Sequence, residues 1–225
     1  MKEWFDNNIR GFVLKDIFGM STPALIALIC FAVLGVCLIA TGKNKKNWNA
    51  RTLAQAALSI AVAFILSCIR LYRMPNGGSV VLCSILPLVA FSAAAGFGRG
   101  LVACVAYGFL QIAQGAWIIH PVQGFLDYVA AYAVLSVGAF APKLPLPEQW
   151  KLPAACILAA FGRWLMHVIA GMVFFASDAI DAGQAPFVYS ALYNLFLAPE
   201  AVLCAVVAAT PAFRRVYAAM QRSAS

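Results

Sequence analysis

Four polar residues lie inside or at the mouth of long apolar segments, where a lipid-facing helix would not tolerate them: Asp127, Arg163, His167 and Asn194. A charge at membrane depth is costly, so such residues usually face a bundle interior or a cavity. The aromatic residues interleaved with them are Trp117, Tyr128, Phe175 and Tyr189. A carboxylate, a guanidinium, an imidazole and an amide beside aromatic rings suit a compact, flat, polar ligand, including a cationic one. The sequence therefore predicts a membrane protein with a small-molecule pocket.

One wall of this pocket is predicted from a four-residue spacing. Arg163, His167, Gly171 and Phe175 follow one another in a single apolar segment, and residues four apart stay on one face of a helix. Glycine would let a ligand ring approach the backbone. In the alternative interpretation, Arg163 extends toward the membrane surface and His167 is an ordinary hydrogen-bonded bundle histidine. Because both residues share a face, the pocket is favoured.

Asp127 and Tyr128 come early in the fifth apolar segment, near its outer end. A carboxylate there can pair with Arg163 or with a cationic ligand, and both interpretations stay open. Residues 117–128 (WIIHPVQGFLDY) hold too many polar and aromatic side chains for an ordinary loop. Asn194 both donates and accepts hydrogen bonds, which suits the edge of an aminopyrimidine.

The composition excludes a soluble domain, because 64% of the residues are hydrophobic and 11% are charged, against about 25% charged in soluble proteins. A membrane-spanning helix needs ~20 residues. We expect an all-α, polytopic membrane bundle, in which the third and fourth segments are short and belong to a tight bundle. Apolar segments are expected near 22–41, 52–71, 80–95, 100–114, 124–141, 152–176 and 187–210.

Basic residues follow alternate segments and predict the orientation. They are Lys43, Lys45, Lys46, Arg51, Arg99, Lys143, Lys151, Arg214, Arg215 and Arg222. The positive-inside rule makes their side cytoplasmic, so we expect a multi-pass protein of the cell membrane with its N-terminus outside and its C-terminus in the cytoplasm. Arg70 and Arg73 are exceptions. The net charge of +8 does not indicate a nucleic-acid partner, because these residues lie at helix ends and form no continuous face.

The chain divides at a charged linker, 42–49. Residues 1–50 are expected to form an N-terminal amphipathic segment and an extra transmembrane helix, and residues 51–225 a six-helix substrate-binding membrane domain. Ala57 and Ala61 lie on a face of small residues that lets helices approach closely. That face packs inside the bundle or docks a partner protein, and both remain open.

Enzyme motifs are absent from the sequence: there is no GxSxG, HExxH or phosphate-binding loop, and the chain holds two histidines. We expect no catalytic residue and no metal site, since the seven cysteines lie in or beside apolar segments without a CxxC pattern. Any energised transport must use ATP hydrolysed by other subunits. The competing hypothesis is an intramembrane enzyme that uses His167 with Asp127.

Four segments together resemble the thiamine-specific substrate-binding (S) components of energy-coupling factor (ECF) transporters. They are 73–79 (RMPNGGS), 120–128 (HPVQGFLDY), 167–175 (HVIAGMVFF) and 189–194 (YSALYN). The match runs from about Arg51 to the C-terminus, in order and with similar spacing. The resemblance implies a six-helix membrane protein that binds thiamine from outside. It also implies three partners, namely one transmembrane coupling protein and two ATPase subunits.

The resemblance also implies roles for single residues. Asp127, followed by Tyr128, would contact the ligand, and His167 and Phe175 would sandwich its rings. By the same resemblance Tyr189 and Asn194 would hydrogen-bond the pyrimidine, Arg163 would lie near the hydroxyethyl end, and Trp117 would be the aromatic residue of the preceding loop. Ala57 and Ala61 match the docking face of the family.

The chain departs from the family pattern at three places. Some members carry glutamate at the position of Asp127 and tryptophan at that of Phe175, and the segment 22–41 lies outside the usual six helices. A related S component for hydroxymethylpyrimidine is the alternative, although a neutral pyrimidine needs no buried carboxylate. We expect the loop of Pro75, Gly77, Gly78 and Ser79 to act as a lid, because glycines absorb large dihedral changes.

Overall fold

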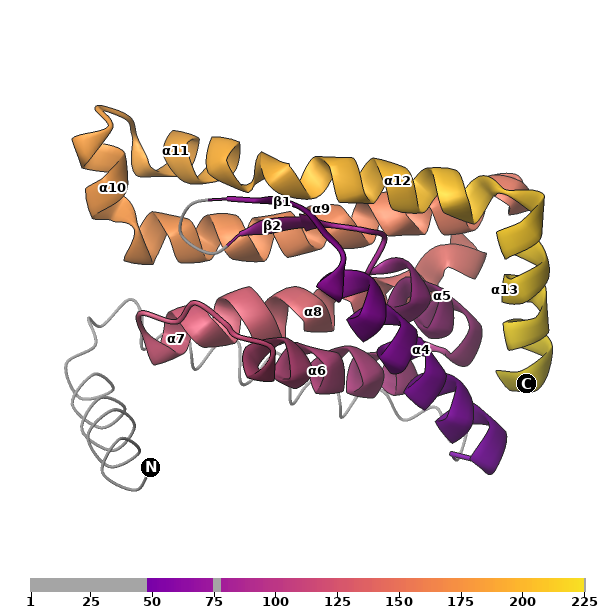
Figure 1. Ribbon diagram of the computed structural model, residues 1–225. Helices are drawn as coiled ribbons and strands as arrows, with labels where there is room; N and C mark the ends of the chain where they lie inside the picture. Colours follow the sequence, from indigo (N-terminus) through magenta and orange to yellow (C-terminus); the bar gives the residue numbers. More distant parts are fainter. Residues whose placement is uncertain (1–47, 75–77, 225) are drawn as a thin grey trace, which may run out of the picture.

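The computed structural model describes residues 48–74 and 78–224. Within them the chain is a bundle of helices with one small β-hairpin (Figure 1). The amphipathic segment and the helix expected at 22–41 lie outside the described residues. The elements are α4 (Ala50–Cys68), β1 (Arg70–Arg73), β2 (Ser79–Val81), α5 (Leu86–Ala95), α6 (Phe97–Ala113), α7 (Pro121–Gly124), η3 (Phe125–Ala130), α8 (Ala131–Ala133), η4 (Val134–Lys143), α9 (Glu148–Phe174), α10 (Ala176–Asp181), α11 (Pro186–Tyr193), η5 (Asn194–Phe196), α12 (Leu197–Ala209) and α13 (Pro211–Ala224).

The all-α membrane bundle is confirmed. Four helical stretches of the described part are long and apolar enough to cross a membrane: Ala50–Cys68, Pro121–Lys143, Glu148–Phe174 and Pro186–Ala209. The two shorter apolar helices are α5 and α6. These six stretches correspond to the six segments expected between residues 52 and 210. Figure 1 shows α11 and α12 running end to end beside α9.

The boundaries of two predicted segments are wrong. The segment 52–71 ends as a helix at Cys68, and residues 70–73 instead form β1, which pairs antiparallel with β2. The sequence Asn-Gly-Gly at 76–78 suits a hairpin turn, which explains why the chain reverses here. The segment expected from residue 80 becomes helical only at Leu86, with proline in its first turn.

Side-chain caps fix where two helices begin. The side chain of Asn49 accepts a hydrogen bond from the backbone N–H of Thr52 at 2.8 Å, at the start of α4. At the start of α7 the Nδ1 atom of His120 accepts one from the backbone N–H of Val122 at 3.1 Å. His120 is therefore a capping residue, which orients the helix that carries the next polar groups.

The core packs α5, η4, α9 and α12 together through small side chains. A Cβ atom on Gly138 would lie 2.7 Å from the carbonyl oxygen of Val89, so η4 and α5 approach each other more closely than any larger residue would permit. The buried residues of this core include Ala90, Cys104, Leu135, Cys156, Ala159 and Cys204.

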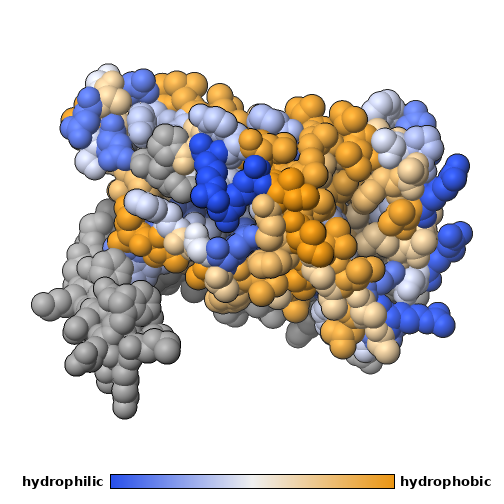
Figure 2. All heavy atoms as spheres, viewed as in Figure 1, coloured by the Kyte–Doolittle hydropathy of each residue, from blue (hydrophilic) through white to orange (hydrophobic). Residues whose placement is uncertain are grey.

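The surface is divided into an apolar band and two polar ends. In Figure 2 hydrophobic residues cover much of the middle of this face, and hydrophilic residues gather at the ends near α10 and α13 and in a patch over the β-hairpin. Large apolar side chains are exposed on several helices of the band, among them Leu58, Val102, Phe161 and Val202. Such a band is what a bilayer covers.

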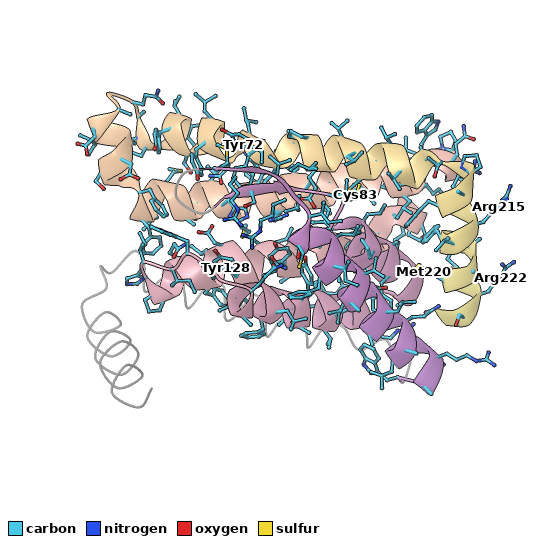
Figure 3. The ribbon with its side chains drawn as sticks, viewed as in Figure 1. Tyr72, Cys83, Tyr128, Arg215, Met220 and Arg222 are labelled. Atoms are coloured by element: carbon cyan, nitrogen blue, oxygen red, sulfur yellow. The ribbon has the colours of Figure 1, made fainter. Side chains whose placement is uncertain are left out.

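The helix α13 was not predicted as a separate element. It begins at Pro211, and Figure 1 shows it crossing the end of the bundle. In Figure 3, Arg215 and Arg222 point away from the bundle and Met220 points toward it. Met220 packs against the core, and its carbonyl oxygen accepts a hydrogen bond from Gln55 at 3.3 Å.

Candidate functional site

The nine residues expected in the pocket line one cavity of the described structure. They are Trp117, Asp127, Tyr128, Arg163, His167, Gly171, Phe175, Tyr189 and Asn194. Gly78 and Ser79 of the expected lid line it too, whereas Pro75 and Gly77 lie outside the described residues. The cavity therefore joins the hairpin to η3, α9, α11 and η5.

A π-helical turn, Phe125–Ala130, carries Asp127 and Tyr128 into this cavity. Turns of this kind often occur at functional sites because they locally widen a helix. The Asp127 carboxylate lies 2.7 Å from Nδ1 of His167 and accepts a 2.6 Å hydrogen bond from Gln123. The Nε2 atom of His167 is buried and has no hydrogen-bond partner among the described residues. The side chain of Asp127 is 15% exposed and that of His167 is 13% exposed.

Arg163 pairs with Glu200 and Tyr132, and the sequence indicated neither of them as its partner. Its Nη1 atom lies 3.2 Å from a carboxylate oxygen of Glu200, and its Nη2 atom donates to the hydroxyl of Tyr132 at 3.0 Å. The side chain is buried, so it neither pairs with Asp127 nor extends toward the membrane surface. Asp127 is thus left to His167 and Gln123.

Glu200 is the main residue that sequence reasoning missed. It is an acidic residue in the apolar segment 187–210, and an ionisable group at membrane depth is a signal of function in its own right. Its Oε1 atom accepts hydrogen bonds from the backbone N–H and the hydroxyl of Ser84, at 2.8 and 2.7 Å. The pairing of Glu200 with Arg163 joins α12 to α9, two helices that are far apart in sequence.

Gly171 lines the cavity, and the packing of two helices also requires a small residue at this position. A Cβ atom there would overlap the hydroxyl of Ser190, so glycine is needed where α9 and α11 cross. Ser190 donates to the carbonyl oxygen of Val168 at 3.0 Å, and Asn194 donates to the carbonyl oxygen of Ser190 at 2.9 Å. The close crossing therefore also positions the amide of Asn194.

Gln123 ties the loop before α7 to the carboxylate. Its amide nitrogen donates to Asp127 and to the carbonyl oxygen of Trp117, at 2.6 and 3.2 Å. Its amide oxygen accepts from the backbone N–H of Ile119 at 3.1 Å. The hydroxyl of Tyr128 accepts from the backbone N–H of Trp117 at 2.9 Å. The polar composition of 117–128 was the correct signal, although Gln123 itself was not singled out.

The aromatic part of the cavity comes from two helix ends. The helix α9 ends at Phe174, so Phe175 lies just past its last turn and still lines the cavity. The rings of Tyr189 and Tyr193 stack with centroids 6.4 Å apart and an interplanar angle of 16°. Tyr193, which also lines the cavity, was not among the predicted residues.

Hydrogen bonds connect three residues of the cavity wall, which come from α8, α6 and α4. The hydroxyl of Tyr132 donates to Gln111 at 3.4 Å, and Gln111 donates to the hydroxyl of Ser67 at 3.1 Å. All three line the cavity. Polar groups within apolar helices were the signal that would have found Gln111 and Ser67.

Similar proteins give the family of this chain. The family model described as "Thiamine transporter protein (Thia_YuaJ)" matches residues 53–218. "Thiamine transporter ThiT" of Bacillus subtilis (strain 168) is 33% identical over 168 residues, which cover 69% of this chain and 86% of that protein. The protein of the same name from Lacticaseibacillus paracasei is 29% identical over 113 residues, 43% of this chain and 56% of that one.

A solved structure of ThiT from Listeria monocytogenes has the same fold. It superposes with a TM-score of 0.56 at 20% identity, over 76% of this chain and 94% of the other. At that identity the likeness concerns the fold alone, whereas the family model covers most of the chain. This chain belongs to the thiamine transporter protein (Thia_YuaJ) family.

Proposed function

We propose that the chain is the thiamine-binding S component of an ECF-type vitamin importer. The family is one of transporters, not of enzymes. The observation that carries the proposal is the Asp127 carboxylate, held by His167 and Gln123 in a cavity whose lining is rich in aromatic and amide side chains. Thiamine joins a permanently cationic thiazolium to a planar aminopyrimidine, and a carboxylate beside aromatic faces answers both.

The remaining groups of the pocket divide between the two ends of that ligand. The buried Nε2 of His167 and the side chain of Asn194 are suited to the hydrogen-bonding edge of the aminopyrimidine. The rings of Phe175 and Tyr189 offer flat faces for stacking. Few polar groups in a largely preformed cavity are typical of small-molecule sites.

The proposed orientation in the membrane has the pocket facing outside. Arg215 and Arg222 point outward from α13 at one end of the molecule (Figure 3), and the positive-inside rule favours that end as cytoplasmic. The hairpin, whose Gly78 and Ser79 line the pocket, then lies toward the outer side. We propose that the loop joining β1 to β2 is a lid, and that thiamine enters the pocket when this lid opens.

The proposed partners are a transmembrane coupling protein and two ATPase subunits, which would hydrolyse the ATP that drives uptake. Ala57 and Ala61 are exposed on α4, whereas Ala56 and Ala63 are buried in the bundle. An exposed face of small residues lets another membrane helix approach closely. This supports docking of the coupling protein on α4 rather than packing within the bundle.

The experiment that tests the proposed function is a fluorescence titration of the purified, detergent-solubilised chain with thiamine. Trp117 lines the cavity and is the reporter, and the Trp117→Phe variant is the control for the origin of the signal. Saturable quenching in the nanomolar range is expected. Trp164 is less useful, because its ring donates to the carbonyl oxygen of Ala191 outside the cavity lining. If hydroxymethylpyrimidine binds as tightly as thiamine, or thiamine does not bind, the proposal is wrong.

A further inference from the structure

Glu200 is a buried carboxylate behind the pocket wall, with 1% of its side chain exposed. Its Oε1 atom accepts two hydrogen bonds from Ser84 and one from the backbone N–H of Ile85 at 3.4 Å, and its Oε2 atom accepts one from Arg163. All these contacts come from donors, as an ionised carboxylate requires. Ser84 and Ile85 directly precede α5, and the N-terminus of a helix favours a negative charge.

Arg163 stands between this carboxylate and the ligand cavity. It lines the cavity and is held from behind by Glu200. The guanidinium also donates to the hydroxyl of Tyr132 and lies 4.6 Å from the centroid of that ring. These contacts fix both the position and the charge environment of the guanidinium.

The balance of charge around the cavity depends on Glu200. The charged residues of the lining are Asp127, Arg70 and Arg163, with His167 paired to Asp127. Arg70 is exposed, so solvent screens it. Without Glu200 the buried guanidinium would repel a ligand cation and attract an anion, and both effects are strong where water is excluded.

We infer that Glu200 is a positioning residue that sets the ligand selectivity of the pocket. By holding and neutralising Arg163, it lets the cavity bind the thiamine cation and discriminates against an anionic phosphate ester of the same molecule. The inference rests on the proposed thiamine binding. It assigns Glu200 an effect on selectivity that is separate from its contribution to packing.

The test is isothermal titration calorimetry of the full chain in detergent, with thiamine and with thiamine monophosphate. The measured quantity is the Kd for the phosphate ester divided by the Kd for thiamine. Glu200→Gln should lower this ratio by roughly tenfold, equivalent to ~1.4 kcal/mol. Arg163→Gln should raise it, and the double variant should return it toward the wild-type value. Ser84→Ala, which keeps the carboxylate charge and removes one hydrogen bond to it, is the matched control and should leave the ratio unchanged.

The outcomes separate this inference from the proposed function. A purely structural role for Glu200 would weaken both ligands together, and an unchanged ratio in Glu200→Gln would overturn the inference while thiamine binding stands. If Glu200→Gln does not fold, Arg163→Gln decides, because a ratio that does not rise there overturns the inference as well. If the wild-type chain binds neither ligand, the proposed function fails and the inference fails with it.

Discussion

Two polar pairs meet the same face of α9 one helical turn apart, and they are closed to different degrees. The open pair, Asp127 with His167, leaves 15% of the Asp127 side chain and 13% of the His167 side chain exposed. The closed pair, Arg163 with Glu200, leaves 9% and 1% exposed. The carboxylate of the closed pair accepts hydrogen bonds from two segments, the turn before α5 and the helix α9. The difference suggests that the open pair meets the ligand and the closed pair holds the wall behind it.

The largest expected effect is on stability, through the closed pair. Glu200→Leu removes one partner of a buried pair and leaves the guanidinium of Arg163 uncompensated, which typically costs about 3–5 kcal/mol. Asp127→Asn should cost far less, because the open pair is partly exposed. Thermal unfolding in detergent without ligand measures both. Equal losses of stability in the two variants would remove the distinction between the pairs.

The next effect is on thiamine affinity, through the open pair. Asp127→Asn keeps the shape of the side chain and removes its charge, so the Kd for thiamine should rise by about 30-fold or more, ~2 kcal/mol or above. Asp127→Glu keeps the charge and is the matched variant, which should bind far more tightly than Asp127→Asn. Calorimetry gives both values. An Asn variant that binds like the wild type would show that the carboxylate does not meet the cation.

A smaller effect concerns Phe175, an aromatic residue that lines the same cavity as the open pair. Phe175→Trp offers a stronger cation–π partner and should lower the Kd for thiamine by about twofold to fivefold, or ~0.5–1 kcal/mol. Phe174→Trp is the neighbouring control, because Phe174 stacks on His120 with centroids 4.9 Å apart and does not line the cavity. A gain of affinity in the control alone would mean that the thiazolium lies elsewhere.

The smallest effect on binding is expected far from both pairs. Ala57→Trp fills the exposed small-residue face of α4 and should leave the Kd for thiamine unchanged while it abolishes thiamine uptake by cells that hold the coupling partners. Val102→Trp, at an exposed site on α6, is the control and should preserve uptake. Normal uptake by the Ala57 variant would place the docking face elsewhere on the bundle.

Much of this molecule follows from local pattern. The lengths of the apolar segments were enough to predict the six helical stretches between residues 52 and 210, because lipid requires each crossing to satisfy its own backbone. Arg163, His167 and Gly171, expected on one helix face from their four-residue spacing, all line the cavity. Both inferences need only the geometry of a single helix.

What could not be predicted depends on contacts between distant segments. The pairing of Arg163 with Glu200 joins α9 to α12, and no spacing within either helix specifies it. The overlap that makes Gly171 necessary involves Ser190 on a neighbouring helix. Likewise, the helix expected at 52–71 stops at Cys68, and residues 70–73 form a strand through their pairing with β2. Sequence pattern supplies the elements, and tertiary packing selects their partners.

The π-helical turn at Phe125–Ala130 has a consequence for how this segment tolerates insertions and deletions. A π-turn contains one residue more than the α-helical path it replaces, so the residues before it and after it are out of step by about 100° in α-helical terms. Deleting one residue there would restore a regular helix and rotate one flank against the other. Either Gln123 would keep its place beside the loop, or η4 would keep its contact with α5, but not both. A single-residue deletion in this turn would therefore disrupt either the ligand-facing half or the core-facing half of the span.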